Sequence, residues 1–126
     1  MSTVGTEALD TLAHRYIAMW NEPDPDLRRA LVDGLFAPAC VHFTPTREVR
    51  GRADMLERVR DAHAQWVAPG KHHFRAVPGA DGHHGAVRFT WEMADTATGA
   101  AVSAGSDFLV LDASGLIVSD HQFIDR

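Results

Sequence analysis

The chain lacks the features that mark several classes of protein. Cys40 is its only cysteine among 126 residues, which excludes an internal disulfide and a cysteine-rich metal site. No apolar run approaches the roughly 20 residues that span a bilayer. The first residues, Met1 to Gly5, do not show the basic start and apolar stretch of a secretory signal. We therefore expect a cytoplasmic protein that does not bind membranes.

Concentrated positive charge is also missing. The formal net charge is −5, and acidic and basic residues are interspersed. Binding to phosphate groups needs a basic stripe, so the sequence argues against nucleic acid as a partner. There are eight histidines, but no spacing among them is a metal signature. His72 and His73 are adjacent, as are His83 and His84, and neighbouring side chains point apart on a strand. We expect no metal and no cofactor.

The length predicts one domain, residues 1–126, that buries about two-thirds of the surface of the unfolded chain. Apolar residues at three- and four-residue spacing predict three helices in the first half, at 7–20, 25–37 and 52–66. Asp24 is expected to cap the second helix, with proline at its first position.

The second half predicts strands. Alternating or apolar segments bounded by turn residues are found at 72–77, 86–93, 101–112 and 116–124, after one short strand at 40–44. The segment 45–51 between the short strand and the third helix is predicted to be a loop. Helices followed by an antiparallel meander indicate an α+β domain, with three helices packed on one face of a curved, mostly antiparallel sheet.

Asp107 is the most informative residue of the strand at 101–112, because it interrupts a run of small and apolar residues. An ionised carboxylate is costly in an apolar interior unless it is paired, and it often stays protonated instead. Asp107 therefore either faces solvent on a half-buried strand or is the polar group of an apolar pocket.

Several segments together resemble the nuclear transport factor 2-like superfamily, which includes ketosteroid isomerases and SnoaL-like polyketide cyclases. The segments are 15–21, 35–37, 39–43, 50–51, 106–111 and 114–118. The resemblance covers almost the whole chain and implies a cone-shaped α+β fold. It also implies a homodimer that pairs through the outer face of the sheet, where Phe108, Val110 and Phe123 would form an apolar strip.

Two positions match the ketosteroid isomerases individually. In those enzymes, a tyrosine on the first helix and a protonated aspartic acid on a late strand form an oxyanion hole. Tyr16 and Asp107 occupy the equivalent positions, so the resemblance implies that both donate hydrogen bonds to one substrate oxygen. The alternative for Tyr16 is a core residue whose hydroxyl bonds to the backbone.

The carboxylate that shuttles the proton in those isomerases has no counterpart here. The match of 39–43 to the isomerase strand puts Phe43 at its position. Strand alternation turns His42 the other way unless a bulge intervenes. In the SnoaL-like cyclases the late-strand aspartate serves as acid/base for ring closure, a role that suits Asp107. His42, His63 or His72 would then be the second proton carrier, and a core role is the alternative for His63.

Other residues are predicted to shape a hydrophobic pocket, because pockets are lined mainly by such groups. They are Trp20, Phe43, Trp66, His72, Phe89, Trp91, Asp120 and Gln122. On the last strand, the gapless match places Asp120 and Gln122 inward and His121 and Phe123 outward, and a slip of one residue would exchange the two faces.

The favoured function is a SnoaL-like cyclase or isomerase that acts on a small hydrophobic carbonyl compound by cofactor-free general acid/base chemistry. Fold alone does not define function in this superfamily. One alternative is a non-catalytic protein of the same fold that binds a hydrophobic ligand or assists another enzyme. A third is an epoxide hydrolase or dehydratase, in which Asp107 and Asp120 would bracket Arg88.

Arg47, Arg50 and Arg52 are interpreted as a solvated group, with binding of a substrate carboxylate as the alternative.

Overall fold

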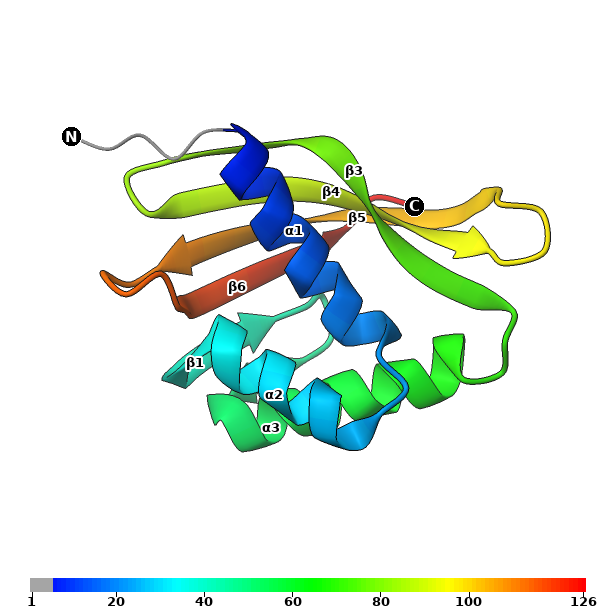
Figure 1. Cartoon of the computed structure of the whole chain (residues 1–126), viewed down its shortest axis with the longest axis horizontal. Helices are drawn as coiled ribbons and strands as arrows, with labels where there is room; N and C mark the ends of the chain where they lie inside the picture. The colour runs from blue at the N-terminus through cyan, green and yellow to red at the C-terminus, as the bar shows by residue number, and fades with distance from the viewer. Residues whose placement is uncertain (1–5) are drawn as a thin grey trace.

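The computed structural model describes residues 6–126, with helices packed against a curved, unclosed sheet (Figure 1). The helices are α1 (Thr6–Asn21), α2 (Pro25–Leu35), α3 (Gly51–Ala62) and a π-helical segment, η1 (His63–Val67). The strands are β1 (Phe36–Phe43), β2 (Glu48–Arg50), β3 (His72–His83), β4 (Ala86–Asp95), β5 (Ala101–Leu111) and β6 (Ile117–Ile124).

The sheet has six strands in the order β2-β1-β6-β5-β4-β3. Only β1 and β6 run parallel, and the other neighbours are antiparallel. Helix α1 crosses in front of the central strands, and α2 and α3 lie together beside β1 (Figure 1). The predicted α+β class, with three helices on a curved and mostly antiparallel sheet, is confirmed.

The elements around β1 differ from the sequence prediction. Strand β1 begins at Phe36, and 48–50, predicted as loop, forms the short edge strand β2 paired with β1. The pairing of β1 with β6 is irregular between Phe36 and Val41. Pro38 lies in this stretch, and proline cannot donate to a strand ladder. Beyond this stretch, Cys40 and His42 are both buried in the core.

Helix α1 is tied to β3 near both of its ends, which fixes the side chains that it presents to the sheet. The Asn21 side chain donates to the Phe74 carbonyl at 2.7 Å and accepts from the Phe74 amide at 2.8 Å. Near the other end, an Asp10 oxygen accepts from the amides of Gly79 and Ala80. Tyr16 and Trp20 lie between these two anchors and are buried.

Helix α2 begins as predicted: the Asp24 side chain accepts hydrogen bonds from the amides of Asp26 and Leu27, and Pro25 opens the helix.

Phe108 and Phe123 lie on the outer face of the sheet, with 43% and 55% of their surface exposed. Within residues 6–126, no helix is long and apolar enough to cross a membrane.

Candidate active site

Four polar side chains from four elements meet inside the fold and form what we call the polar cluster. They are Tyr16 from α1, His42 from β1, Asp107 from β5 and Asp120 from β6. Each side chain is at most 1% exposed. The Tyr16 hydroxyl lies 2.8 Å from Asp107 Oδ2 and 2.6 Å from Asp120 Oδ2. Asp107 and Asp120 follow Tyr16 by 91 and 104 positions in the sequence, and both converge on its phenol oxygen.

The hydrogen bonds of the polar cluster require a protonated carboxyl group. A phenol carries one proton, so Tyr16 cannot donate to both carboxyls at once. Burial raises the pKa of Asp107 well above its usual range, and the Asp120 carboxylate raises it further. Burial also raises the pKa of Asp120, but hydrogen bonds from Asp107 and Tyr16 lower it in part. We therefore assign the proton to Asp107 and the negative charge to Asp120.

Two further contacts support this assignment. The indole nitrogen Nε1 of Trp91 donates to Asp107 Oδ1 at 2.8 Å, which leaves Oδ2 as the carboxyl oxygen that holds the proton. Burial, followed by the nearby Asp107 and Asp120, raises the pKa of Tyr16 well above 10.0, so the phenol stays protonated. The polar cluster thus contains two neutral O–H donors directed at one carboxylate.

His42 completes the polar cluster as a neutral imidazole. Burial lowers its pKa to about 4, and the positive charge of Arg58 acts in the same direction while Asp107 opposes it. His42 Nδ1 lies 2.8 Å from Asp120 Oδ2. Because a carboxylate only accepts, Nδ1 carries the proton and Nε2 keeps its lone pair. Nε2 is buried and has no hydrogen-bond partner. A carboxylate-held histidine with a free Nε2 is an arrangement suited to a general base.

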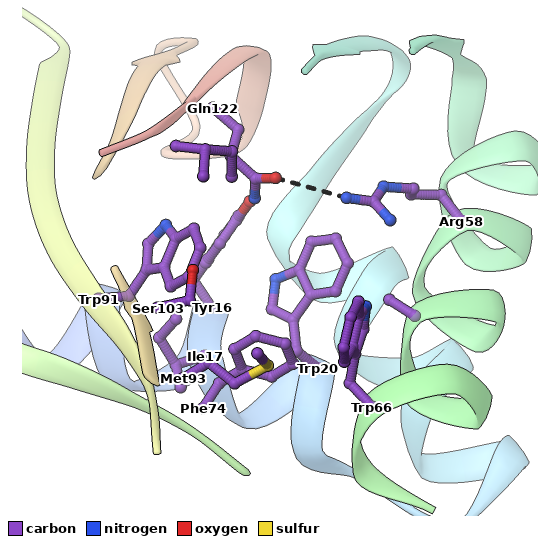
Figure 2. Close-up of a pocket in the computed structure, with 12 residues that line it drawn as sticks. Tyr16, Ile17, Trp20, Arg58, Trp66, Phe74, Trp91, Met93, Ser103 and Gln122 are labelled. Atoms are coloured by element: carbon purple, nitrogen blue, oxygen red, sulfur yellow. Dashed lines mark hydrogen bonds between the residues drawn. The ribbon is translucent and has the colours of Figure 1, made fainter. Parts of the chain in front are cut away.

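A cavity of about 360 Å³ lies beside the polar cluster (Figure 2). Its lining is Tyr16, Ile17, Trp20, Arg58, Ala62, Trp66, Phe74, Trp91, Met93, Ser103, Gln122 and Ile124. Trp91 lies on one side and Trp20 and Trp66 on the other, so all three tryptophans of the chain face this space. Tyr16 belongs both to the lining and to the polar cluster, which places the cluster directly behind the cavity wall.

Five of the predicted site residues line the cavity, namely Tyr16, Trp20, Trp66, Trp91 and Gln122. Asp107, Asp120 and His42 lie behind Tyr16 in the polar cluster. The predicted faces of the last strand are confirmed, since Asp120 is buried and Gln122 lines the cavity while His121 and Phe123 are exposed.

Besides the polar cluster and Phe43, three predicted residues lie outside the cavity lining. Phe89 is buried against Tyr16, with ring centroids 5.2 Å apart. His72 packs edge-on against Trp66 at 6.1 Å. His63 is buried at the start of the π-helical segment, and burial lowers its pKa. Packing accounts for the positions of Phe89 and His63, and neither reaches the polar cluster through a hydrogen bond.

The predicted orientation at the end of β1 is wrong. Phe43 is only half-buried, and its ring packs on His121 at 4.9 Å and under the Arg50 guanidinium at 5.8 Å. His42 is the residue that points inward, since Cys40 and His42 are buried and alternate with the half-buried Val41 and Phe43. The inner position on this strand is therefore occupied by a histidine held by Asp120, rather than by phenylalanine.

The arginines considered from sequence do not reach the cavity. Arg88 is exposed and pairs with Asp81 at 3.4 Å, so the arrangement of two acids around Arg88 does not form. Arg50 pairs with Glu48, and Arg52 donates to the Phe36 carbonyl. Arg58 lines the cavity instead.

Sequence reasoning missed Arg58. It follows Met55 by three residues and precedes Ala62 by four, so helical spacing places all three on one face of α3. That spacing was the available signal. Sequence reasoning also missed Ile17, Phe74, Met93 and Ser103 as lining residues.

A metal site is a second interpretation of the polar cluster. His42, Asp107 and Asp120 offer one ligand atom each, all within 4.8 Å of one another. However, the Oδ2 atoms lie against the Tyr16 hydroxyl, and Asp107 Oδ1 accepts from Trp91. Of the four carboxyl oxygens, Asp120 Oδ1 alone has no partner. The arrangement fits a shared proton better than a cation.

Comparisons with known proteins identify the family and the fold. The SnoaL-like domain family matches residues 13–119. A proposed isomerase of the SnoaL-like family from Agrobacterium tumefaciens is 28% identical, with a TM-score of 0.83 over 92% of this chain and 96% of that one. No curated protein matches the chain.

Two more distant structures share the fold alone. An NTF2-like protein of unknown function from Exiguobacterium is 18% identical, with a TM-score of 0.70 over 90% of this chain and 98% of that one. A proposed polyketide cyclase from Sinorhizobium meliloti is 14% identical, with a TM-score of 0.66 over 94% and 99%. The family match extends over most of the sequence and across both the helices and the sheet, and the chain belongs to the SnoaL-like domain family.

Proposed function

We propose that the protein is an isomerase or cyclase that moves a proton on a small hydrophobic carbonyl compound without a cofactor. The observation that carries the proposal is the polar cluster behind the wall of an apolar cavity, with Tyr16 common to both. The similarity to a proposed isomerase of the same family supports it.

His42 is the general base in this proposal. Its imidazole is neutral near pH 7 and Nε2 is free, so it can take a proton from the carbon next to the substrate carbonyl. A base with a pKa near 4 binds a proton weakly, which limits the driving force. Asp120 offsets this limit, because its carboxylate accepts from Nδ1 and stabilises the imidazolium that forms.

Tyr16 and Asp107 stabilise the other product of that step. Loss of the proton moves the C–H electron pair toward the carbonyl and forms an enolate oxygen. The two O–H donors of the polar cluster are Tyr16 and protonated Asp107. A preorganised donor of this kind contributes about 3 kcal/mol to the stability of a transition state. Return of the proton to another carbon completes an isomerisation. For ring closure, the enolate carbon attacks a second carbonyl, the π bond of that carbonyl breaks, and the alkoxide that forms takes the proton back from the His42 imidazolium.

Deuterium exchange tests the proposal, because it reports proton abstraction whatever the product is. A panel of small cyclic and aromatic ketones is incubated with the protein in D₂O, and loss of the α-proton signal is followed by NMR. We expect exchange with the native protein and a loss of about 100-fold or more in His42→Gln. His121→Gln is the matched control, because residue 121 is exposed on the opposite face of β6. Equal rates in both variants would contradict the role of His42.

A second candidate function is a binding protein, and one observation favours it. The side chains of His42, Asp107 and Asp120 are sealed behind the cavity lining, and the Tyr16 hydroxyl is already held by two carboxyls. In a binding protein the polar cluster would only orient a ligand carbonyl. Asp107→Asn would then weaken ligand binding slightly, and no compound of the panel would exchange its α-protons.

A further inference from the structure

Arg58 is the one charged residue among the described residues that line the cavity. It extends from α3 toward Gln122 on β6, across a space otherwise bounded mainly by aromatic and aliphatic side chains (Figure 2). A guanidinium beside an apolar cavity is costly to desolvate, so its partners show whether its charge is already used inside the protein.

The edge of the Arg58 guanidinium that carries Nε and Nη2 has donor capacity left unused. Nε is buried and has no hydrogen-bond partner among residues 6–126. Nη2 donates to Gln122 Oε1 at 3.4 Å, which is long for such a bond. The guanidinium also lies 5.1 Å above the Trp20 ring, a contact that holds its plane in place without using an N–H group.

No described carboxylate forms an ion pair with Arg58, although α3 and its surroundings carry several acids that pair elsewhere or face solvent. The acids of the polar cluster act on Arg58 only at longer range. Burial lowers the pKa of Arg58 and the positive charge of Arg47 lowers it further, while Asp107 and Asp120 oppose that change. Arg58 stays charged, because a guanidinium does not lose its proton in proteins.

We propose that the cavity takes a ligand with a carboxylate at one end, and that Arg58 binds this carboxylate through Nε and Nη2. This names the substrate class of the proposed enzyme and in that sense rests on the proposed function. The fork of two parallel N–H groups matches the two oxygens of a carboxylate. The long bond to Gln122 is the only hydrogen bond of this edge that a ligand would replace.

The remainder of the cavity indicates the rest of the ligand. Trp91 faces Trp20 and Trp66 across the space, which suits a flat ring or a short aliphatic body between them (Figure 2). Arg58 is the one arginine of the lining, and near it the charge of Arg47 outside the lining is opposed by Asp107 and Asp120. One guanidinium in the cavity matches a monoanion better than a phosphate dianion. The predicted ligand is therefore a small apolar monocarboxylate that also carries the carbonyl on which the polar cluster acts.

A pair of probes that differ only in charge tests the inference without turnover. The probes are 4-phenylbutyrate and its neutral analogue 4-phenylbutyramide. Because all three tryptophans line the cavity, quenching of the intrinsic fluorescence reports its occupancy, and calorimetry gives the dissociation constants. We expect the native protein to bind the carboxylate about tenfold or more tightly than the amide, since hydrogen bonds between charged groups are the strong ones.

The variant Arg58→Gln should remove this preference and leave the affinity for the amide within about threefold of the native value. Arg58→Lys should keep part of the preference, because an ammonium supplies charge without the fork. Arg60→Gln is the matched control. It lies on the same helix, is exposed and pairs with Glu57, so the native preference should remain.

Three results would overturn the inference: equal affinity of the native protein for the two probes, an unchanged preference in Arg58→Gln, or no binding of either probe. The outcome is separate from the proposed function. A protein that prefers carboxylates but exchanges no α-proton would keep the Arg58 site and lose the enzyme. A protein that exchanges protons on neutral ketones and shows no charge preference would keep the enzyme and lose the Arg58 site.

Discussion

Both faces of the β5–β6 hairpin depart from the usual pattern of a sheet. The face toward the helices holds Asp107, Asp120 and Gln122, and the outer face holds the exposed rings of Phe108 and Phe123. Folding normally buries apolar groups and exposes charge. The buried polar groups of the inner face lower the stability of the fold and provide a set of proton donors and acceptors. The exposed rings of the outer face form an apolar surface of the kind that a partner covers.

Asp120→Asn should produce the largest effect on the inner face. An amide has the shape of the carboxylate but lacks its charge, so it would neither hold His42 in the same tautomer nor stabilise the imidazolium. We expect the α-deuterium exchange rate to fall by about 1,000-fold or more, with an unchanged circular dichroism spectrum. A rate within tenfold of the native one would mean that Asp120 does not act on the base.

The pH dependence of the free energy of unfolding distinguishes His42 from Asp107. The folded-state pKa of His42 is about 4, below its ordinary 6.5, so the unfolded chain binds a proton more readily between these values. The free energy of unfolding should therefore rise with pH across this window, by about 3 kcal/mol at most. Urea titrations at a series of pH values should show this rise in the native protein and its loss in His42→Gln.

Asp107 should contribute a slope of the opposite sign. Its folded-state pKa lies above the ordinary 3.8, so the folded protein binds the proton more tightly. Asp107 makes its full contribution to the free energy of unfolding below about pH 3.8. The contribution falls as the pH rises toward the folded-state pKa. Asp107→Asn resembles the protonated acid and should remove the fall in the same urea titrations. A variant with the native pH profile would contradict the assignment of the proton to Asp107.

Gly105→Ala should disturb the inner face more mildly. A Cβ at this position would lie 2.4 Å from the Trp91 ring and 2.3 Å from the Phe123 carbonyl, so the indole must move and its bond to Asp107 must weaken. We expect a loss of about 1–3 kcal/mol in chemical denaturation. Gly34→Ala is the control, because its Cβ meets only the end of the Arg15 side chain at 3.7 Å in a helix and should be neutral or slightly stabilising.

The outer face should matter least to the chemistry. We propose that two copies of the chain pair through Phe108, Val110 and Phe123 on this surface. Phe123→Lys combined with Phe108→Glu should shift a dimer to a monomer in sedimentation experiments and leave the exchange rate within about twofold. A native protein that sediments as a monomer would remove this proposal and leave the apolar strip without a partner.

The order of the elements and the convergence of Tyr16 with Asp107 could be predicted, because helical spacing, strand alternation and the family resemblance all operate along the sequence. The inward turn of His42 could not. The family match set the register of this strand, and in the structure Cys40 and His42 are the buried residues instead. The match of 39–43 to the isomerase strand put Phe43 inside, and strand alternation then turned His42 outward. A slip of one residue exchanges the two faces, so both positions were wrong together.

The tertiary contacts of Arg58 and Asp120 were also beyond sequence reasoning. Helical spacing puts Arg58 beside the buried face of α3, but only the position of α3 against β6 shows that the guanidinium faces the cavity. Asp120 was predicted to face inward, at the pocket mouth. Its role as the shared acceptor for Tyr16 and His42 depends on the parallel pairing of β1 with β6, which joins segments 78 residues apart.

The most direct test of the central claim, that the polar cluster performs proton transfer, is the rate of α-deuterium exchange in Asp107→Asn. The amide preserves the shape of the acid but cannot pass on an O–H proton, and Trp91 and Tyr16 still hold it in place. The account predicts a fall of about 100-fold or more in a protein that remains folded. An unchanged rate would contradict it and would leave Asp107 as a residue of structure alone.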